Sequence, residues 1–177
     1  MEDKKINVII RQEEASDFPA VYDLNSQAFK RKQEARLVDR LRLSDDFIPE
    51  LSLVATLEGK VVGYILFSKI SIIDNDKENI SLSLAPIAVC AEMQHKGIGS
   101  RLIYAGLDKA KELGYQSVIV LGHPDYYPRY GFEPTTKWQI RPPFNIPEKS
   151  FMAIELVEGG LSDVRGIVRY SKEFEDI

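Results

Sequence analysis

The chain has 177 residues, 44% of them hydrophobic, so it can bury one substantial core but is too short for two comfortable domains. We expect a single domain over residues 1–177. Its 23 lysines and arginines against 27 aspartates and glutamates give a net charge of -4, which implies no general attraction to nucleic acid or anionic lipid. The single cysteine, Cys90, excludes an internal disulfide, and His95 and His123 lack metal-ligand spacing, so we expect no metal. No apolar stretch is long enough to cross a bilayer, and we expect a cytoplasmic protein.

The first part of the chain predicts one strand and two helices. Residues 6–11 alternate apolar and polar side chains, which is the pattern of a strand. Apolar residues then recur at helical spacing over 18–29 and again over 33–43, where charged residues occupy the other side. We therefore expect two amphipathic helices after the first strand.

A hairpin is predicted next. Strands over 51–57 and 61–71 flank the tight turn Glu58-Gly59-Lys60, in which a glycine suits a positive φ. The polar, charged residues 75–79 predict a loop, and an extended, mostly apolar segment follows over 81–90.

The second part of the chain predicts a strand–helix–strand unit. Helical spacing runs from Gly97 to residue 113 and stops at Gly114, a suitable C-cap, and residues 116–121 have the pattern of a buried strand. This order predicts a right-handed crossover between parallel strands. Two more strands are predicted over 151–156 and 166–170. We expect an α/β fold with a mixed sheet, antiparallel at first and parallel in the middle, with helices on both faces.

The most informative stretch is Gln94-His95-Lys96-Gly97-Ile98-Gly99, where an extended run gives way to a helix. Glycines let the backbone approach a ligand closely, and the first N–H groups of a helix lack partners and sit at the positive end of its dipole. The stretch therefore predicts a site for a phosphate-bearing ligand. Two common phosphate patterns are absent: Leu102 occupies the last glycine position of G-x-G-x-x-G, and G-x-x-x-x-G-K-[ST] occurs nowhere.

The stretch instead resembles the pyrophosphate-binding motif [QR]-x-x-G-x-[GA] of the GCN5-related N-acetyltransferase (GNAT) superfamily, through Gln94, Gly97 and Gly99. Farther along, Tyr126-Tyr127-Pro128-Arg129-Tyr130-Gly131-Phe132 resembles the tyrosine-then-glycine-phenylalanine motif near the C-terminal end of that superfamily's domain. Two such motifs in order, separated by one helix and one strand, are far more specific than either alone. The resemblance implies an N-acetyltransferase with the GNAT fold, whose fourth and fifth strands splay apart.

The resemblance covers residues 6–156, with 84–132 as its diagnostic core, and is nearest to a bacterial-type subgroup of uncharacterised acetyltransferases. It implies acetyl-CoA as co-substrate, with the pantetheine arm paired to the backbone of the fourth strand. The implied contacts are Ile87, Ala88 and Val89 for pantetheine, and the amides of Gln94, His95, Lys96, Gly97, Ile98, Gly99 and Ser100 for the pyrophosphate. Pro86 independently indicates a strand with one free side, because proline cannot donate to a ladder, with a simple bulge as the alternative.

Transfer of an acetyl group to an amine needs a base, stabilisation of the oxyanion and a proton for the departing thiolate. A backbone N–H near Ala88 or Val89 could polarise the carbonyl. Tyr127 lies four residues before Gly131, which by resemblance is the spacing of the general-acid tyrosine. The alternative for Tyr127 is a place in an aromatic packing cluster.

The base is not evident, because residues 81–89 hold no acid or histidine where many superfamily members place a glutamate. Two candidates remain: His123, at the end of the following strand, and Glu34, on the second helix, which by resemblance forms a wall of the acceptor site. The proline-rich residues 141–147 are expected on that side too.

The sequence is also compatible with two other classes of function. One is a CoA-binding sensor or regulatory module without turnover, favoured by the missing acid on the fourth strand. The other is an interaction domain that binds no cofactor. For the enzyme, we expect a small-molecule or protein amine as the acceptor, and the C-terminal strands over 151–170 leave a homodimer open.

Overall fold

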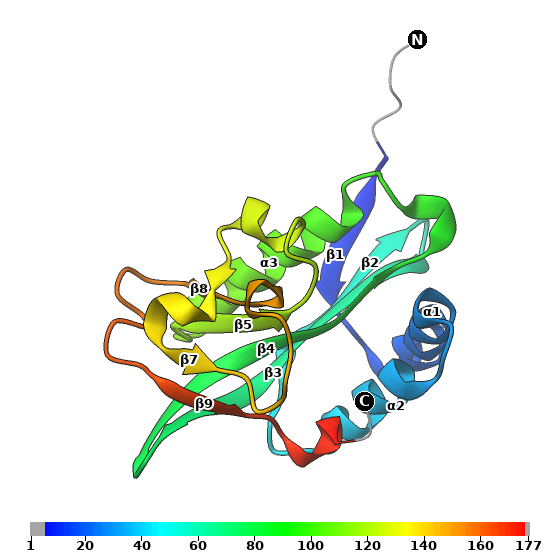
Figure 1. Cartoon of the computed structure of the whole chain (residues 1–177). Coiled ribbons are helices and arrows are strands. Elements are labelled where there is room, and N and C mark those ends of the chain that lie inside the picture. The colour runs from blue at the N-terminus through cyan, green and yellow to red at the C-terminus, as the bar shows by residue number, and fades with distance from the viewer. Residues whose placement is uncertain (1–5, 176–177) are drawn as a thin grey trace.

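The computed structural model describes residues 6–175, which form a mixed sheet with helices on both faces (Figure 1). The helices of the described residues are α1 (Phe18–Phe29), α2 (Gln33–Arg42) and α3 (Ile98–Glu112). The strands are β1 (Val8–Gln12), β2 (Phe47–Leu57), β3 (Lys60–Asp74), β4 (Lys77–Val89), β5 (Ser117–Leu121), β6 (Glu133–Pro134), β7 (Ile140–Arg141), β8 (Phe151–Glu155) and β9 (Gly166–Arg169). Among these residues no helix is both long and apolar enough to cross a membrane.

The sheet has the order β1-β2-β3-β4-β5-β8-β6. Strands β1 to β4 form an antiparallel meander, β5 runs parallel to β4, and β8 returns antiparallel to β5. The long strand β3 pairs with β4 on one edge and, on the other, first with β2 and then with β9. The predicted change from antiparallel to parallel pairing, with α3 as the crossover, is confirmed.

Two hydrophobic layers cover the sheet, one on each face. On one face α3 packs through Ile98 and Leu102 against Ile65 and Phe67 of β3. On the other face α1 and α2 pack against the alternate residues of β3, including Tyr64 and Leu66. Because successive strand residues point to opposite faces, β3 is buried on both sides.

A buried polar network fixes α2 against the sheet. The Arg42 guanidinium donates to both carboxylate oxygens of Glu13 at 2.9 Å. Ser52 Oγ donates to Glu13 at 2.6 Å and lies 2.7 Å from the Tyr64 hydroxyl. Since these groups satisfy one another, the network holds α2 in one position on the sheet.

The two central strands separate where the sequence predicts a splay. β4 and β5 pair only at Leu82↔Val118 and Ser83↔Ile119, so within the described residues the rest of β4 toward Val89 has no strand on that side. Between the pairs Ile65↔Ile87 and Phe67↔Leu84, two β4 residues lie opposite one of β3, and one of the two is Pro86. Pro86 therefore occupies a bulge and also faces a free edge.

One predicted element is wrong: residues 75–79 do not form a loop. β3 continues to Asp74 and β4 begins at Lys77, leaving a two-residue turn. Cross-strand contacts support these polar strand ends, because Glu78 accepts hydrogen bonds from Ser71 at 2.6 Å and from Arg169 of β9 at 3.1 Å. The structure also begins β2 at Phe47, earlier than predicted, and adds the two-residue strands β6 and β7, which are too short to have a periodicity.

Candidate active site

The glycine-rich stretch forms an open cradle of backbone amides at the start of α3. Gly97 is the N-cap of the helix, with a φ of 80° that favours glycine, and His95 has a φ of 62°. Within the part of the chain that the structure describes, no backbone carbonyl accepts from the amides of residues 95–100. A Cβ on Gly97 would meet no atom within 4 Å. Free amides, the helix dipole and open space together make this a site for an anion.

The side chains of the predicted pyrophosphate segment have different surroundings. Gln94 Nε2 donates to the Val89 carbonyl at 3.4 Å, and the side chains of His95 and Lys96 are exposed. Ile98 is buried in the core, so it can offer a ligand only its amide. The segment therefore acts mainly through its backbone.

The predicted pantetheine segment lies beside this cradle. Ile87, Ala88 and Val89 pair with β3 on one edge, opposite Ile65, Tyr64 and Gly63 respectively. Their other edge lies past the last β4–β5 pair, so its backbone groups are available to a ligand that extends along the strand.

A chain of hydroxyl groups joins the start of α3 to the aromatic turn Tyr127–Tyr130. Ser100 Oγ lies 2.7 Å from the Tyr130 hydroxyl, which donates to the Tyr126 hydroxyl at 2.9 Å. The Tyr126 oxygen lies 3.1 Å from where a Cβ on Gly99 would be. A Cβ on Gly99 would therefore press against the Tyr126 hydroxyl, and the hydroxyl chain holds the aromatic turn in place beside the amide cradle.

Tyr127 stands apart from this hydroxyl chain. It is 8% exposed, and its ring packs edge-on against Phe132 at 5.7 Å and against Tyr126 at 5.1 Å between centroids. No hydrogen bond joins its hydroxyl to another described residue. Burial, with a smaller contribution from Tyr130, raises the pKa of Tyr127 to about 12, so near neutral pH the phenol is a proton donor.

Gly122 makes room for the Tyr127 ring. A Cβ on Gly122 would lie 2.2 Å from Cε2 and 2.8 Å from Cδ2 of that ring. The structure gives the physical reason for a glycine at this position.

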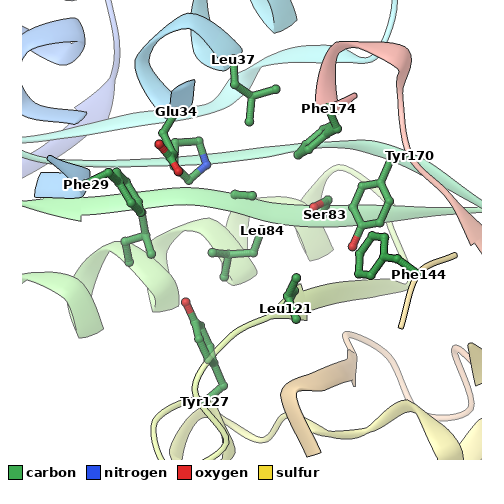
Figure 2. Close-up of a pocket in the computed structure, with 13 residues that line it drawn as sticks. Phe29, Glu34, Leu37, Ser83, Leu84, Leu121, Tyr127, Phe144, Tyr170 and Phe174 are labelled. Carbon is green, nitrogen blue, oxygen red and sulfur yellow. The ribbon is translucent and has the colours of Figure 1, made fainter. Parts of the chain in front are cut away.

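The hydroxyl of Tyr127 points into a cavity of about 460 Å³ that opens where β4 and β5 part (Figure 2). Helices α1 and α2 form one wall, β4 and β5 form the floor, and segments near the C-terminal end of the described chain form the far wall. The lining residues are Phe29, Glu34, Leu37, Ser83, Leu84, Ala85, Pro86, Ile87, Leu121, Tyr127, Phe144, Tyr170 and Phe174. The proline-rich stretch reaches the cavity through Phe144, and the second helix through Glu34 and Leu37.

The two candidate bases lie in different surroundings. Glu34 lines the cavity, its side chain is 7% exposed, and both carboxylate oxygens accept hydrogen bonds from the Arg31 guanidinium. His123 is exposed, accepts a hydrogen bond from the Asp125 amide at 3.3 Å and does not line the cavity. The structure thus brings Tyr127 and Glu34 to one cavity and leaves His123 outside it.

Tyr170 and Phe174 are cavity residues that the sequence does not reveal. They follow β9, and the pairing of β9 with β3 brings them to the cavity from far along the chain. No motif surrounds them, so their sequence gives no sign of this position. Within residues 6–175 no cluster of three or more His, Cys, Asp or Glu side chains is arranged to hold a metal ion.

Comparison with known proteins identifies the family. The family model described as Acetyltransferase (GNAT) family matches residues 18–132. The chain belongs to the GNAT family. A GNAT relative from Escherichia coli K12, the uncharacterized N-acetyltransferase YhbS, is 36% identical over 168 residues, which cover 94% of this chain and 98% of its own length. The uncharacterized N-acetyltransferase YjhQ from the same strain is 41% identical over 135 residues, covering 76% of this chain and 75% of its own.

Solved GNAT structures share the fold. A crystal structure of YhbS from Escherichia coli in complex with CoA superimposes with a TM-score of 0.90 at 32% identity, covering 98% of this chain and 95% of that one. A GNAT acetyltransferase from Brucella melitensis in complex with acetyl-CoA has a TM-score of 0.78 at 27% identity, covering 96% and 99%. The predicted family, the GNAT fold with its splayed strands and the enzyme class are therefore confirmed.

Proposed function

We propose that this GNAT enzyme transfers the acetyl group of acetyl-CoA directly to a primary amine of a small molecule or a protein. The observation that carries this proposal is the succession of two sets of open backbone groups and a cavity along one side of the sheet. It runs from the amide cradle at residues 95–100 along the open edge of β4 to the cavity that holds the Tyr127 hydroxyl. GNAT membership and the CoA-bound structures of YhbS and the Brucella protein support it.

The residues present fit acetyl-CoA. The amides of residues 95–100 would hold the pyrophosphate, with Lys96 as an added positive charge, and the backbone of Ile87 to Val89 would pair with the pantetheine arm. The Gln94 amide, which the sequence also suggested for the pyrophosphate, instead donates to the Ala91 carbonyl at 3.5 Å. The open space at Gly97 leaves room for the phosphates. When bound, acetyl-CoA supplies an activated acetyl thioester at the splay between β4 and β5.

Two side chains of the cavity have complementary proton chemistry. Tyr127 is a neutral phenol with a free hydroxyl, which suits it to give a proton to the departing sulfur. Glu34 is a carboxylate beside the same space, which suits it to accept a proton from the incoming ammonium, directly or through a water near Ser83. A backbone N–H on the open edge of β4 would polarise the acetyl carbonyl. Val89 suits this better than Ala88, because the Cys90 amide donates to Val62 of β3 and the Ala88 amide, two residues away, faces the same strand.

Glu34 is our preferred base, because it shares the cavity with Tyr127 and His123 does not. It also supplies from α2 the acid that residues 81–89 lack, which removes the feature that favoured a sensor without turnover. A covalent route through Cys90 is less suitable, since burial raises the pKa of its thiol and keeps it protonated.

We further propose that residues 1–177 act as one domain in the cytoplasm. A reducing compartment suits a chain whose only cysteine is a free thiol.

Calorimetry with CoA, followed by thiol release over a panel of amines, tests the function. Gly97→Val should abolish CoA binding by placing a side chain against the pyrophosphate, and Gly59→Val is the matched control, because Gly59 has a similar φ of 78° in an exposed turn. Micromolar affinity retained in Gly97→Val would show that the loop does not bind the phosphates. CoA binding without turnover of any amine would favour the sensor.

A further inference from the structure

One end of the cavity is an aromatic wall, formed by Phe144, Tyr170 and Phe174 (Figure 2). Phe144 stacks on Tyr170 with a centroid distance of 6.0 Å and an interplanar angle of 19°. Tyr170 in turn packs on Phe174, tilted by 50° with centroids 5.1 Å apart. The three rings come from two separate segments of the chain and form one continuous face toward the cavity.

This aromatic wall is fixed to the rest of the fold at both ends of its C-terminal segment. Tyr170 directly follows β9, whose Val168 pairs with Ile72 of β3. Beyond it, the short helix Lys172–Phe174 is tied to α2, because Arg40 donates to the Glu173 carbonyl at 2.8 Å. A wall held in this way is preorganised, so a ligand need not order it on binding.

The cavity has little means of recognising a highly charged molecule. Among the thirteen residues that line it, Glu34 alone is charged, and Arg31 already compensates that carboxylate. The remaining lining is mostly apolar. The cavity of about 460 Å³, part of which the acetyl thioester would occupy near Ile87, suits a small organic acceptor and is too small for a folded partner.

The cavity has two chemically different ends. Figure 2 shows Glu34 and the Tyr127 hydroxyl on one side, together with Phe29, and the aromatic wall on the other. The reacting nitrogen must lie at the first end, where the proton donor and acceptor are. The remainder of the molecule then extends toward the aromatic wall, where the Tyr170 hydroxyl makes no hydrogen bond with any described residue and remains free for a polar group.

We propose that the acceptor is a small arylalkylamine, bound with its aromatic ring on Phe144, Tyr170 and Phe174 and its amine between Glu34 and Tyr127. This inference rests on the proposed acetyl transfer and adds the substrate class. Stacked and edge-on ring contacts stabilise such a ligand beyond the burial of its surface. Polyamines and acidic amines would find no charged partner at the far end.

The test compares amines that share a primary amine and differ in the rest. We expect kcat/KM for 2-phenylethylamine to exceed that for propylamine on the order of 30- to 100-fold, because the ring adds buried apolar surface. Spermidine and a short peptide with an N-terminal phenylalanine should both be poorer substrates than phenylethylamine. A preference for either, or equal use of propylamine, would overturn the proposal.

Variants of the enzyme test where the aromatic ring of the substrate binds. Phe144→Ala should lower kcat/KM for phenylethylamine on the order of 10-fold and that for propylamine far less, since only the aromatic substrate reaches the wall. Leu43→Ala removes a side chain that is 91% exposed and does not line the cavity, so it should change neither. An equal loss for both amines in Phe144→Ala would mean that the ring does not lie there.

A binding measurement separates the failure of this inference from failure of the proposed function. Phenylethylamine should bind the CoA-loaded enzyme in calorimetry, and Phe144→Ala should weaken that binding. Acetylation of propylamine without such binding would refute the arylalkylamine and leave the acetyltransferase intact. Phenylethylamine binding that depends on Phe144, without acetylation of any amine, would refute the transfer and support the aromatic site.

Discussion

Gly122→Ala tests whether the position of the Tyr127 ring controls the reaction. Gly122 does not have a φ in the left-handed region, so its backbone accepts alanine, and the conflict is with the ring alone. The new Cβ would start 2.2 Å from Tyr127 Cε2. To regain carbon–carbon contact at about 3.5–4 Å, the ring must retreat by about 1.5 Å.

A shift of this size moves the hydroxyl out of its place in the cavity. Misplacement of a catalytic group by about 1 Å costs on the order of 100-fold in rate, so we expect kcat to fall by about that factor. The added strain should lower the free energy of unfolding by about 1–3 kcal/mol, which leaves a folded protein to assay. CoA affinity should stay nearly unchanged, because Gly122 and the Tyr127 ring are not part of the amide cradle at residues 95–100.

The rates of thiol release by the wild type, Gly122→Ala, Tyr127→Phe and the double variant form a double-mutant cycle. This cycle isolates the coupling between residue 122 and the Tyr127 hydroxyl. Tyr127→Phe alone should slow acetyl transfer and leave CoA affinity nearly intact. If Gly122→Ala acts through the Tyr127 hydroxyl, it should slow the Tyr127→Phe enzyme far less than the wild type. An undiminished rate in Gly122→Ala, or the same loss in both backgrounds, would refute the reasoning.

Three further predictions concern proton transfer and stability. Glu34→Gln should lower kcat on the order of 100-fold or more with the fold intact. The control Glu112→Gln, on the exposed surface of α3, should have no effect on kcat. A Glu34→Gln enzyme with undiminished kcat would show that Glu34 is not the base. Because the pKa of Tyr127 in the free enzyme is raised to about 12, the proton donor persists above the ordinary tyrosine value of 10, and the alkaline fall of kcat/KM due to this group should appear near pH 12; a fall centred at pH 10 would contradict this. Glu13→Ala should lower the free energy of unfolding in urea by about 3 kcal/mol, because it leaves the buried Arg42 guanidinium without its main partner, and a loss under about 1 kcal/mol would count against the network.

The part of the site proposed to bind acetyl-CoA could be predicted from the sequence, because each of its features lies within a few neighbouring residues. Gly97 and Gly99 lie next to the helix start that they serve, and Pro86 lies in the strand whose edge is free. The spacing of Tyr127 before Gly131 is also read within one turn of chain. Each of these features depends on backbone geometry over a few residues, which short motifs record.

The acceptor side could not be predicted in the same way. Tyr170 and Phe174 reach the cavity through strand pairing with a distant segment, whereas Glu34, which pairs with Arg31 only three residues away, could be named from the sequence. The prediction of a loop over 75–79 was wrong for a related reason. The polar strand ends are supported there by β9, which lies alongside and whose Arg169 donates a hydrogen bond to Glu78. Periodicity within one segment carries no information about such neighbours.

β2 and β9 pair with the same edge of β3, and this arrangement determines the order in which the parts of the site can form. During synthesis, the chain has produced β1 to β5 and α3, and with them the complete amide cradle, before β9 exists to extend the sheet beyond β2. The aromatic wall can form only after β9 has closed a contact of long sequence separation, which is a slow class of folding step. A nascent or partly unfolded molecule can therefore expose a finished anion cradle while it still lacks the surface that selects the amine.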